Sequence, residues 1–571
     1  MHAPRFYQSQ MQNGIFDAWQ GGETNVLAVL PTGGGKTKVL SDVILENDKP
    51  SVTFAHRQEL VGQISTALAR NGVRHRVIGP PNVVKHCVNL HIVETGRSFV
   101  DPGAWHAVAG VDTLIRRAKE QESWLKQVRL GVIDEAHHVL KGNKWGQAFE
   151  MLPNAFGLGV TASPCRADGR GLGAAWDGIF NVMIEGPSMR QLINMGYLTD
   201  YQIFAPPSDY KRPEIVGSSG DFTPDSMRKA SKESKIVGDI VAHYKRLAMG
   251  KLGVTFVTDL ETAEEVAREF NEAGIPALVV SSKSTQEERV GAIAKFKRRE
   301  VLQLVNVDLF GEGFDLPAIE VVSFARPTES LGLFIQQFGR VLRLFIGAEL
   351  MAQWEGLSIE QRQWYINSSS KPVGIVIDHV GNISRHLLPD TYRKWTLKRR
   401  DRRSSSGQSG GVPMWACFEC SRSWEKIYNS CLQCGAPMPE PASRSSPEFV
   451  DGDLIELSAE ILEHLRGERD RVDLTAGEIQ AEAAAKYMPH VGQLTAVKKH
   501  REWQLVQAGL RDSLAWWAGY QRHLGRPDSE SYRRFYFNFG IDVLSAQSLK
   551  TKEAVDLKQK IDEHLTIVQR A

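Results

Sequence analysis

The sequence predicts an α/β protein whose parallel sheets carry helices on both faces. Short apolar runs rich in β-branched residues recur between Asn25 and about Ala325, among them NVLAVL, SVTFAH, RLGVIDE and LQLVNVD. Amphipathic stretches separate most of these runs, an alternation typical of buried parallel strands joined by helices. The runs are too numerous for one sheet, so we expect one doubly wound sheet before about residue 185 and a second from about 235 to 390.

The chain of 571 residues is longer than one hydrophobic core usually serves, which predicts three or four domains. Polar, basic and Ser/Gly-rich stretches mark their limits, and helical periodicity returns after a second linker. We expect a first lobe at 1–185, a connecting segment at 186–234, a second lobe at 235–392, a linker at 393–413, a cysteine module at 414–437 and a helical domain at 450–571.

The composition, 42% hydrophobic and 24% charged, is that of an ordinary globular protein. No apolar run reaches the ~18 residues that a membrane span needs, and the N-terminus shows no basic segment followed by an apolar one. We therefore expect a cytoplasmic protein. The net charge of +2 neither demands nor excludes a nucleic acid partner.

The stretch LPTGGGKT directly follows a predicted strand and precedes a predicted helix. This is the context of a phosphate-binding loop, in which backbone N–H groups and a helix N-terminus point at phosphate oxygens. Lys36 is expected to reach the outer phosphates of ATP, and Thr37 to ligate Mg²⁺. Leu30 stands where the usual pattern has its first glycine, but that position is the entry of the loop. The predicted cradle comprises Thr32, Gly33, Gly34, Gly35, Lys36 and Thr37.

A second strand, in VIDEAHH, ends with Asp134 and Glu135. Asp134 is placed to hold the metal ion through water, and Glu135 to orient and deprotonate the water that attacks the phosphoanhydride. Two acids at a strand end also occur in ordinary solvated turns, so this pair gains its meaning from the phosphate loop.

These motifs and their order resemble the superfamily 2 helicases of the DEAH type, the group that includes restriction-enzyme motor subunits and bacterial and phage DNA-repair helicases. The resemblance covers residues 1 to about 390 and implies two RecA-like lobes. It rests on RFYQ (5–8), FAHRQELVGQ (54–63), VAGVDTLIRR (108–117), VTASP (160–164), VNVDLFGEGFDLP (305–317) and QQFGRVLR (336–343).

The resemblance also implies roles for single residues. Gln8 would read the adenine edge while Tyr7 or Arg5 stacks on the base, and Gly313 and Asp315 would contribute to the nucleotide site from the second lobe. Asp112 stands where the family often has glutamine, and an acid would repel a phosphate backbone. Thr113 and Arg116 are therefore better candidates for the strand contact. The implied nucleic acid contacts are His56, Arg57, Thr113, Arg116, Thr161, Ser163 and Arg166.

QQFGRVLR places Arg340 and Arg343 three residues apart, and we expect them on one helical face with Gln336 a further turn back. An arginine from a facing domain can stabilise the charge that hydrolysis spreads over the transferred phosphoryl group. Because these residues belong to the second lobe and Lys36 and Glu135 to the first, ATP would be cleaved only when the lobes close.

Four of the six cysteines, Cys417, Cys420, Cys431 and Cys434, form two Cys-x-x-Cys knuckles separated by ten residues. Four thiolates at this spacing can surround a tetrahedral Zn²⁺ at ~2.3 Å and leave no position for water, which predicts a structural zinc ribbon. An iron site or a redox dithiol pair is the alternative. The ribbon would contact nucleic acid or a partner, or act only as a metal-stapled spacer.

The C-terminal region turns from acidic to basic after residue 483, and its stretch WWAGYQRHLGRPDSESYRRFYFNFG predicts two helices joined near Gly525. Its aromatic residues recur at helical spacing and are expected to form a core. Arg522, Arg526, Arg533 and Arg534 remain possible phosphate contacts.

The sequence therefore predicts an ATP-dependent helicase or translocase with ATP, Mg²⁺ and Zn²⁺ as cofactors and DNA as the favoured substrate. An RNA helicase, and a motor subunit or nucleic-acid-binding scaffold of a defence or repair complex, are the alternatives. A protein partner would bind through the ribbon or the C-terminal helices.

Overall fold

The structure is a computed structural model of the chain that divides into two compact units, Met1–Ser409 with Ser421–Ser423 and Gly410–Cys420 with Trp424–Ala571. Each unit is described by itself. The described residues are 4–55, 57–205, 213, 216–217, 220–233, 236–307, 316–391, 393, 395–399, 414–417, 419–428, 430–438, 471–485, 490–524, 526 and 528–569.

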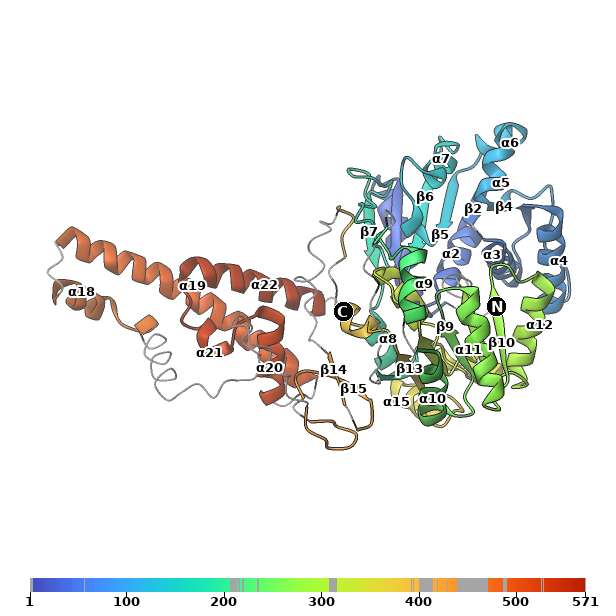
Figure 1. Cartoon of the computed structure of the whole chain (residues 1–571). Helices are drawn as coiled ribbons and strands as arrows, with labels where there is room; N and C mark the ends of the chain where they lie inside the picture. The colour runs from blue at the N-terminus through green and yellow to red at the C-terminus, as the bar shows by residue number, and fades with distance from the viewer. Residues whose placement is uncertain are drawn as a thin grey trace. The chain divides into compact units, whose positions relative to one another are not determined.

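The first lobe of the larger unit is a parallel sheet of seven strands in the order β3-β4-β2-β5-β6-β1-β7 (Figure 1). The strands are β1 (Asn25–Val29), β2 (Ser51–Ala55), β3 (His75–Ile78), β4 (His106–Gly110), β5 (Leu130–Asp134), β6 (Phe156–Thr161) and β7 (Val182–Glu185). The helices are α1 (Phe6–Gln20), α2 (Lys36–Glu46), α3 (Gln58–Arg70), α4 (Pro81–Thr95), α5 (Val111–Arg116), α6 (Ala118–Leu125) and α7 (Lys144–Glu150). Because all pairs are parallel, the ends of β1, β5 and β6 meet at one edge.

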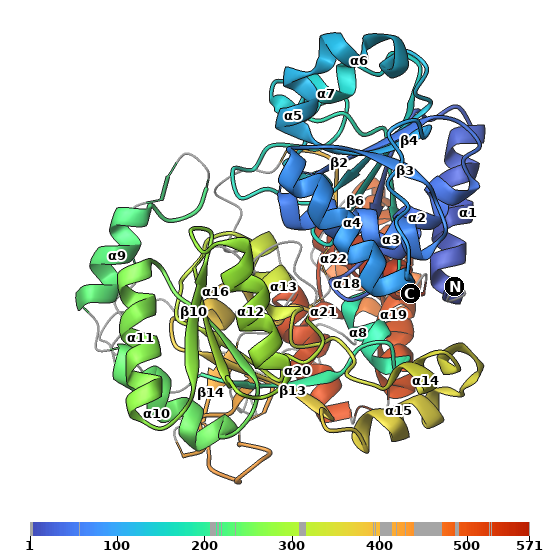
Figure 2. The same cartoon turned by 90° about the vertical axis from the view of Figure 1, so that its right-hand side faces the viewer.

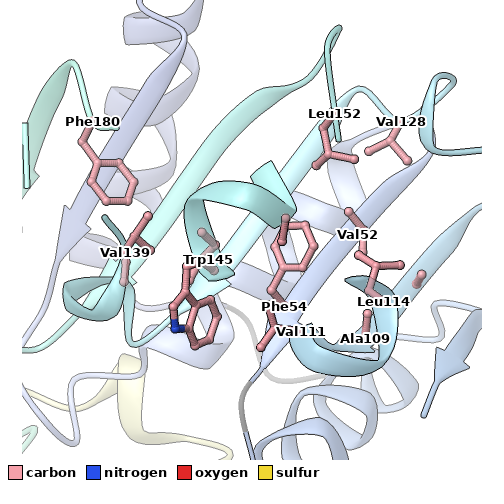
Figure 3. Close-up of a cluster of buried hydrophobic side chains, with 14 of the residues drawn as sticks. Val52, Phe54, Ala109, Val111, Leu114, Val128, Val139, Trp145, Leu152 and Phe180 are labelled. Carbon is pink, nitrogen blue, oxygen red and sulfur yellow. The ribbon is translucent and has the colours of Figure 1, made fainter. Parts of the chain in front are cut away.

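One face of this sheet carries a large apolar cluster. Phe54, Trp145 and Phe180 are almost fully buried in it, and Figure 3 shows them against the strands. Burying side chains of this size supplies ~1.5–3 kcal/mol each and fixes the strands relative to one another. This rigid platform holds the strand ends that carry the site.

The second lobe is a parallel sheet of six strands in the order β10-β11-β9-β12-β13-β8. The strands are β8 (Asp200–Phe204), β9 (Gly253–Phe256), β10 (Ala277–Ser281), β11 (Gln303–Val307), β12 (Val321–Phe324) and β13 (Val373–Asp378). The helices from residue 189 onward are α8 (Met189–Asn194), α9 (Pro224–Glu233), α10 (Ile236–Ala248), α11 (Leu260–Glu272), α12 (Gln286–Lys297), α13 (Leu331–Phe338), α14 (Ala348–Met351), α15 (Ile359–Asn367) and α16 (Asn382–His386). Figure 2 shows α10 and α11 side by side over this sheet.

Two segments differ from their expected roles. The stretch 186–234, expected to connect the lobes, contains β8, which pairs with β13 as the edge strand of the second sheet. The stretch 393–413, expected to be a linker, begins with residues that fold back on the first lobe. Trp395 and Leu397 pack against its core, and Gly173 donates a hydrogen bond to the carbonyl of Leu397 at 2.9 Å. Each segment contains a short apolar stretch that can be buried. These stretches are hard to recognise in the sequence because polar residues surround them.

The smaller unit has a two-stranded ribbon, β14 (Met414–Ala416) and β15 (Ser423–Glu425), and a set of helices. The helices are α18 (Ala476–Ala485), α19 (His490–His523), α20 (Asp528–Phe539), α21 (Val543–Ala546) and α22 (Thr551–Gln569). Leu510, Trp517 and Phe535 lie in their buried core, which confirms the predicted core for part of the aromatic stretch, but Trp516 and Tyr532 are exposed. Within the described part of the chain, every helix falls short of the length and apolarity that a bilayer crossing requires.

Candidate functional site: a cleft between the lobes

The phosphate loop connects β1 to α2 and has the backbone that a cradle needs. Gly33 and Gly35 have φ values of +84° and +88°, in the left-handed region that favours glycine. A Cβ on Gly34 would lie 2.8 Å from Cγ of Leu30, which is fully buried beneath the loop. Leu30 therefore supports the cradle from below and leaves its open side free.

The two acids lie at the end of β5, which is separated from β1 by the strand β6. Gln336 of α13 donates a hydrogen bond from its Nε2 to Oε2 of Glu135 at 3.1 Å, and both side chains are buried. Since Glu135 belongs to the first lobe and Gln336 to the second, this bond joins the lobes inside the cleft.

A pocket within the larger unit is lined by residues of both lobes. It contains the predicted phosphate-loop residues except Gly34, together with both acids, Gln336 and both arginines. Its lining comprises Arg5, Thr32, Gly33, Gly35, Lys36, Thr37, Gln63, Asp134, Glu135, Tyr197, Pro317, Gln336, Arg340, Arg343, Leu344 and Met351. The expectation that the arginines stand on a helical face is wrong, because α13 ends at Phe338. They follow in tight turns, with Arg340 N–H bonded to the carbonyl of Gln337 at 3.2 Å, and these turns still carry both into the pocket.

The pocket is strongly polar. Enclosure among protein atoms lowers the pKa of Lys36, the carboxylates of Glu135 and Asp134 raise it, and Arg340 and Arg343 lower it again. Lys36, Arg340 and Arg343 thus share one cleft with two carboxylates, and Arg5 also lines it. A polyphosphate with its counter-ion would compensate the facing cations, which is the charge arrangement expected of an ATP site.

The N-terminal element is placed differently from a simple base reader. Tyr7 Oη and Gln8 Nε2 both donate to the carbonyl of Gly34, at 2.9 and 3.1 Å, and Gln8 Oε1 accepts from the N–H of Arg5. The hydrogen bonds of Gln8 are therefore made to the phosphate loop and its own helix. The guanidinium carbon of Arg5 lies 4.7 Å from the centre of the Tyr197 ring, and both residues line the pocket.

Several pocket residues have no signal in the sequence motifs. Tyr197 lies in an irregular segment, Met351 ends the short helix α14, and Gln63 closes a motif assigned to strand binding. Tyr197 donates to Glu355 at 2.9 Å, and Arg362 covers its second face at 4.5 Å. Only the folded chain brings this cluster to the nucleotide cleft.

A chain of polar contacts leads from the acids to the second lobe. Nδ1 of His137 lies 3.6 Å from Glu135 Oε2 and 3.1 Å from the hydroxyl of Thr161. Ser163 donates its backbone N–H to the same hydroxyl at 3.2 Å. Its own side chain is buried and faces Gly332 at the start of α13, where an added Cβ would lie 3.0 Å from Ser163 Oγ. Thr161 and Ser163 therefore lie between Glu135 and the second lobe.

The other predicted strand contacts lie outside this pocket. Thr113 is buried, Arg116 is exposed, and Asp112 is paired with Lys144 at 2.9 Å, which directs its charge toward a cation. Arg57 precedes α3 as its N-cap, and Arg166 is bound to Asp168 at 2.6 Å and to the carbonyl of His137 at 3.0 Å. Three residues that the family resemblance assigns to the strand and nucleotide contacts, His56, Gly313 and Asp315, lie outside the described residues.

The four cysteines of the smaller unit converge. Their sulfur atoms all lie within 4.8 Å of one another, and the pairs Cys417–Cys434 and Cys420–Cys431 are each 3.5 Å apart. A tetrahedron with ~2.3 Å zinc–sulfur bonds has sulfur–sulfur edges of about 3.8 Å, so the donor set fits Zn²⁺. The indole of Trp424 donates to the sulfur of Cys431 at 3.2 Å, as an outer-shell donor to a thiolate would. The remaining cysteines, Cys87 and Cys165, are buried.

The fold and the cleft together define a two-lobe ATPase, and comparison with known proteins gives its family. A family model described as "Type III restriction enzyme, res subunit" matches residues 1–166, and one described as "Helicase conserved C-terminal domain" matches residues 236–345. A "51.5 kDa protein" of a Lactococcus phage is 30% identical over 409 residues, which cover 71% of this chain and 76% of that protein. The chain belongs to the superfamily 2 helicases of the restriction-subunit type. It is an ATP-dependent enzyme with a nucleic acid motor.

A yeast protein and a solved structure are also similar to this chain. The Saccharomyces cerevisiae protein named "Putative ATP-dependent helicase IRC3" is 28% identical over 362 residues, covering 60% of this chain and 49% of that protein. This chain thus matches about three quarters of the phage protein but about half of the yeast one. Among solved structures, "The fragment structure of a putative HsdR subunit of a type I restriction enzyme from Vibrio vulnificus YJ016" is 19% identical, with a TM-score of 0.48, and covers 68% of this chain and 67% of that one.

Proposed function

We propose that this helicase is a DNA motor that moves along one strand as its lobes close on ATP and reopen after hydrolysis. The observation that carries the proposal is the hydrogen bond between Glu135 and Gln336, made inside a pocket also lined by Lys36, Arg340 and Arg343. Because the two lobes contribute complementary parts of one site, chemistry requires closure. Closure can therefore be converted into movement along a strand.

Each pocket residue has a role in this proposal. Lys36 and the backbone N–H groups of the glycine loop bind the phosphates, and Glu135 takes a proton from the attacking water. Arg340 and Arg343 stabilise the charge that develops on the transferred phosphoryl group. Thr37 and Asp134, which both line the pocket, would hold Mg²⁺, and the ion supplies further neutralisation of phosphate charge when bound.

The preference for DNA rests on the family match of the first lobe, whose description names the res subunit of a restriction enzyme. Motors of this type bind mainly sugar and phosphate, so little sequence preference is expected. RNA is the second candidate, because the motor motifs are shared. The strand contacts are proposed for Arg57, Thr113, Arg116, Thr161, Ser163 and Arg166.

The smaller unit is proposed to be a structural zinc ribbon joined to a helical domain. Its four sulfur atoms fit a closed tetrahedral site, which has no open position for substrate. In this proposal the unit binds nucleic acid or a protein partner, and the chain works as the motor of a defence or repair complex.

The substrate is tested by measuring ATP turnover with single-stranded DNA, duplex DNA, forked DNA and single-stranded RNA of matched length. We expect single-stranded or forked DNA to raise turnover most. Stimulation by RNA alone would reverse the substrate assignment, and an equal rate with and without any nucleic acid would contradict the motor proposal.

The pocket is tested by Lys36→Ala, Arg340→Ala and Arg343→Ala, with Arg298→Ala as the matched control. Arg298 belongs to the same lobe but is exposed and paired with Glu300 at 2.6 Å. Each arginine variant should lose about 1,000-fold in turnover, as trans-acting arginines do elsewhere, and Lys36→Ala should lose turnover yet keep strand binding. Wild-type turnover in Arg343→Ala would remove the arginines from the mechanism.

A further inference from the structure

Lys371 is a buried lysine immediately before β13, in the second lobe. Its side chain is almost fully enclosed, at 1% exposed. Its ammonium group donates to two backbone carbonyls, that of Arg343 at 2.7 Å and that of Pro317 at 3.0 Å. A buried ammonium is costly unless it is hydrogen-bonded, and an apolar side chain would fill the same space without that cost. The presence of lysine here therefore calls for a function.

The two carbonyls belong to separate loops that both line the pocket. Pro317 ends the motif that precedes β12, and Arg343 ends the turns that follow α13; both residues line the pocket. The two loops are separated by β12 and α13 in the chain. Lys371 contacts both loops, because its ammonium donates to one carbonyl in each.

We propose that Lys371 is a positioning residue that ties these two loops together and so sets the reach of Arg343 toward the nucleotide phosphates. This inference rests on the proposed role of Arg343. It assigns no contact between Lys371 and the nucleotide, and it predicts that loss of Lys371 impairs the chemical step more than nucleotide binding.

Charge couples this contact to the site. Burial lowers the pKa of Lys371 to about 7, Arg343 lowers it as well, and Glu320 raises it. Glu320 is itself bound to the N–H of Leu252 at 2.9 Å and to Arg299 at 3.1 Å, so its charge is shared. The charged ammonium makes the stronger hydrogen bonds. The positioning effect should therefore be complete below pH 7 and weaken as the pH rises through this value.

The experiment compares wild type with Lys371→Met, Lys371→Arg and the control Lys251→Met, measuring kcat, KM for ATP and their pH dependence at saturating DNA. Lys251 lies in the same lobe and contacts the same Glu320, at 3.5 Å, but is 35% exposed. We expect kcat of Lys371→Met to fall at least 10-fold with KM changed less than 3-fold. Lys251→Met should stay within 2-fold of wild type.

The pH profile separates positioning from a general loss of structure. In wild type, kcat/KM should decline as pH rises through about 7, since this ratio reports the free enzyme. Lys371→Arg, whose guanidinium stays charged, should keep activity and lose this decline. A wild-type profile that is flat from pH 6 to 8.5, or Lys371→Met with wild-type kcat, would overturn the inference.

Failure of the inference can be told from failure of the proposed function. If Arg343→Ala is inactive while Lys371→Met is normal, the arginine site stands and only the role of Lys371 is wrong. If Arg343→Ala is fully active, the proposed function itself fails. If Lys371→Met does not fold, the pH profiles of kcat/KM for wild type and Lys371→Arg still test the inference.

Discussion

Glu135 shows how single residues are shaped for the reaction. Its φ of +52° lies in the left-handed region, which is uncommon for a residue other than glycine and costs on the order of 1 kcal/mol or more. Neighbours hold it there, since its N–H donates to Oδ1 of Asp134 at 2.9 Å and its carboxylate accepts from Gln336. The strained backbone aims the carboxylate into the cleft, toward the proposed position of the attacking water.

A buried polar chain in the first lobe predicts a dependence of stability on pH. His75 Nε2 contacts Ser65 Oγ at 2.7 Å, and Ser65 Oγ contacts His91 Nε2 at 3.0 Å. Burial lowers the pKa of His75 to about 4, below its ordinary value near 6.5. Because the folded state disfavours the proton, His75 contributes stability above pH 6.5, and that contribution is lost as the pH falls toward 4.

His75→Asn removes the titrating group at this position. The loss of stability relative to wild type should be largest above pH 6.5, up to about 3 kcal/mol, and should shrink as the pH falls to 5. Thermal midpoints measured at pH 7.5, 6.5, 5.5 and 5.0 check this. A difference between the two proteins that stays constant over this range would contradict the assigned pKa.

At the scale of elements, the turn after α13 decides how closely the lobes approach. Gly339 ends that helix, and a Cβ placed on it would lie 2.5 Å from Cβ of Thr32 in the phosphate loop. Such a distance is not tolerated without movement of one lobe. The helix itself ends at Phe338, whereas QQFGRVLR predicts that it continues to Arg343, and tight turns replace the expected helical face.

Gly339→Ala should therefore hold the second lobe away from the phosphate loop and reduce DNA-stimulated turnover at least 10-fold. Gly347→Ala is the matched control, because both glycines have φ near −60° and a Cβ on Gly347 meets nothing within 4 Å. Binding of a fluorescent ATP analogue to the first lobe should persist in Gly339→Ala. Equal turnover in the two variants would show that the lobes need not approach so closely.

In the smaller unit, three of the four arginines that were possible phosphate contacts are used internally: Arg526, which precedes α20, and Arg533 and Arg534, which belong to it. Arg534 pairs with Glu425 at 2.7 Å and with Glu530 at 2.8 Å, and Arg533 donates to the carbonyl of Ile427 at 2.6 Å. Arg526 donates to Gln521 at 2.6 Å. These bonds fasten the ribbon to the helices, so the ribbon and α20 form one body.

Arg534→Leu leaves the two largely buried carboxylates without their arginine, and removal of one partner from such a network costs on the order of 3 kcal/mol. The thermal transition of this unit should fall by several degrees. Arg501→Leu, on the exposed side of α19, is the control and should have little effect. The measurement is differential scanning calorimetry of the full chain, and equal shifts for both variants would count against a ribbon anchored through Arg534.

At the scale of the whole molecule, the nucleotide site and the cysteine site belong to separate units. Every pocket residue lies in the larger unit, whereas the four sulfur atoms lie in the smaller one. The two sites should therefore be separable by substitution.

Cys431→Ser should reduce bound zinc from about one ion per chain to well below that, as counted by elemental analysis, and should lower the thermal transition of the smaller unit. DNA-independent ATP turnover should stay within 2-fold of wild type. Cys87→Ala, a buried cysteine of the first lobe, should leave the zinc content unchanged. Iron in place of zinc, or no metal at all, would contradict the structural zinc site.

The sequence by itself determined the alternation of strands and helices, the phosphate loop, the acids after β5 and the cysteine spacing. Such features depend on neighbours a few residues apart, and local periodicity and motif chemistry report them directly. The sequence also placed Arg340 and Arg343 correctly in the cleft, although on the wrong kind of local structure.

Only the tertiary structure decided which distant residues complete the site. Tyr197 and Lys371 have no motif of their own, and Gln63 belongs to a motif assigned to strand binding. They matter here because the fold carries them to the pocket or to the loops that line it. The structure also directed Gln8 to the phosphate loop and assigned β8 to the second sheet. The physical reason is that burial and partner choice depend on contacts between residues far apart in the chain, which local patterns do not encode.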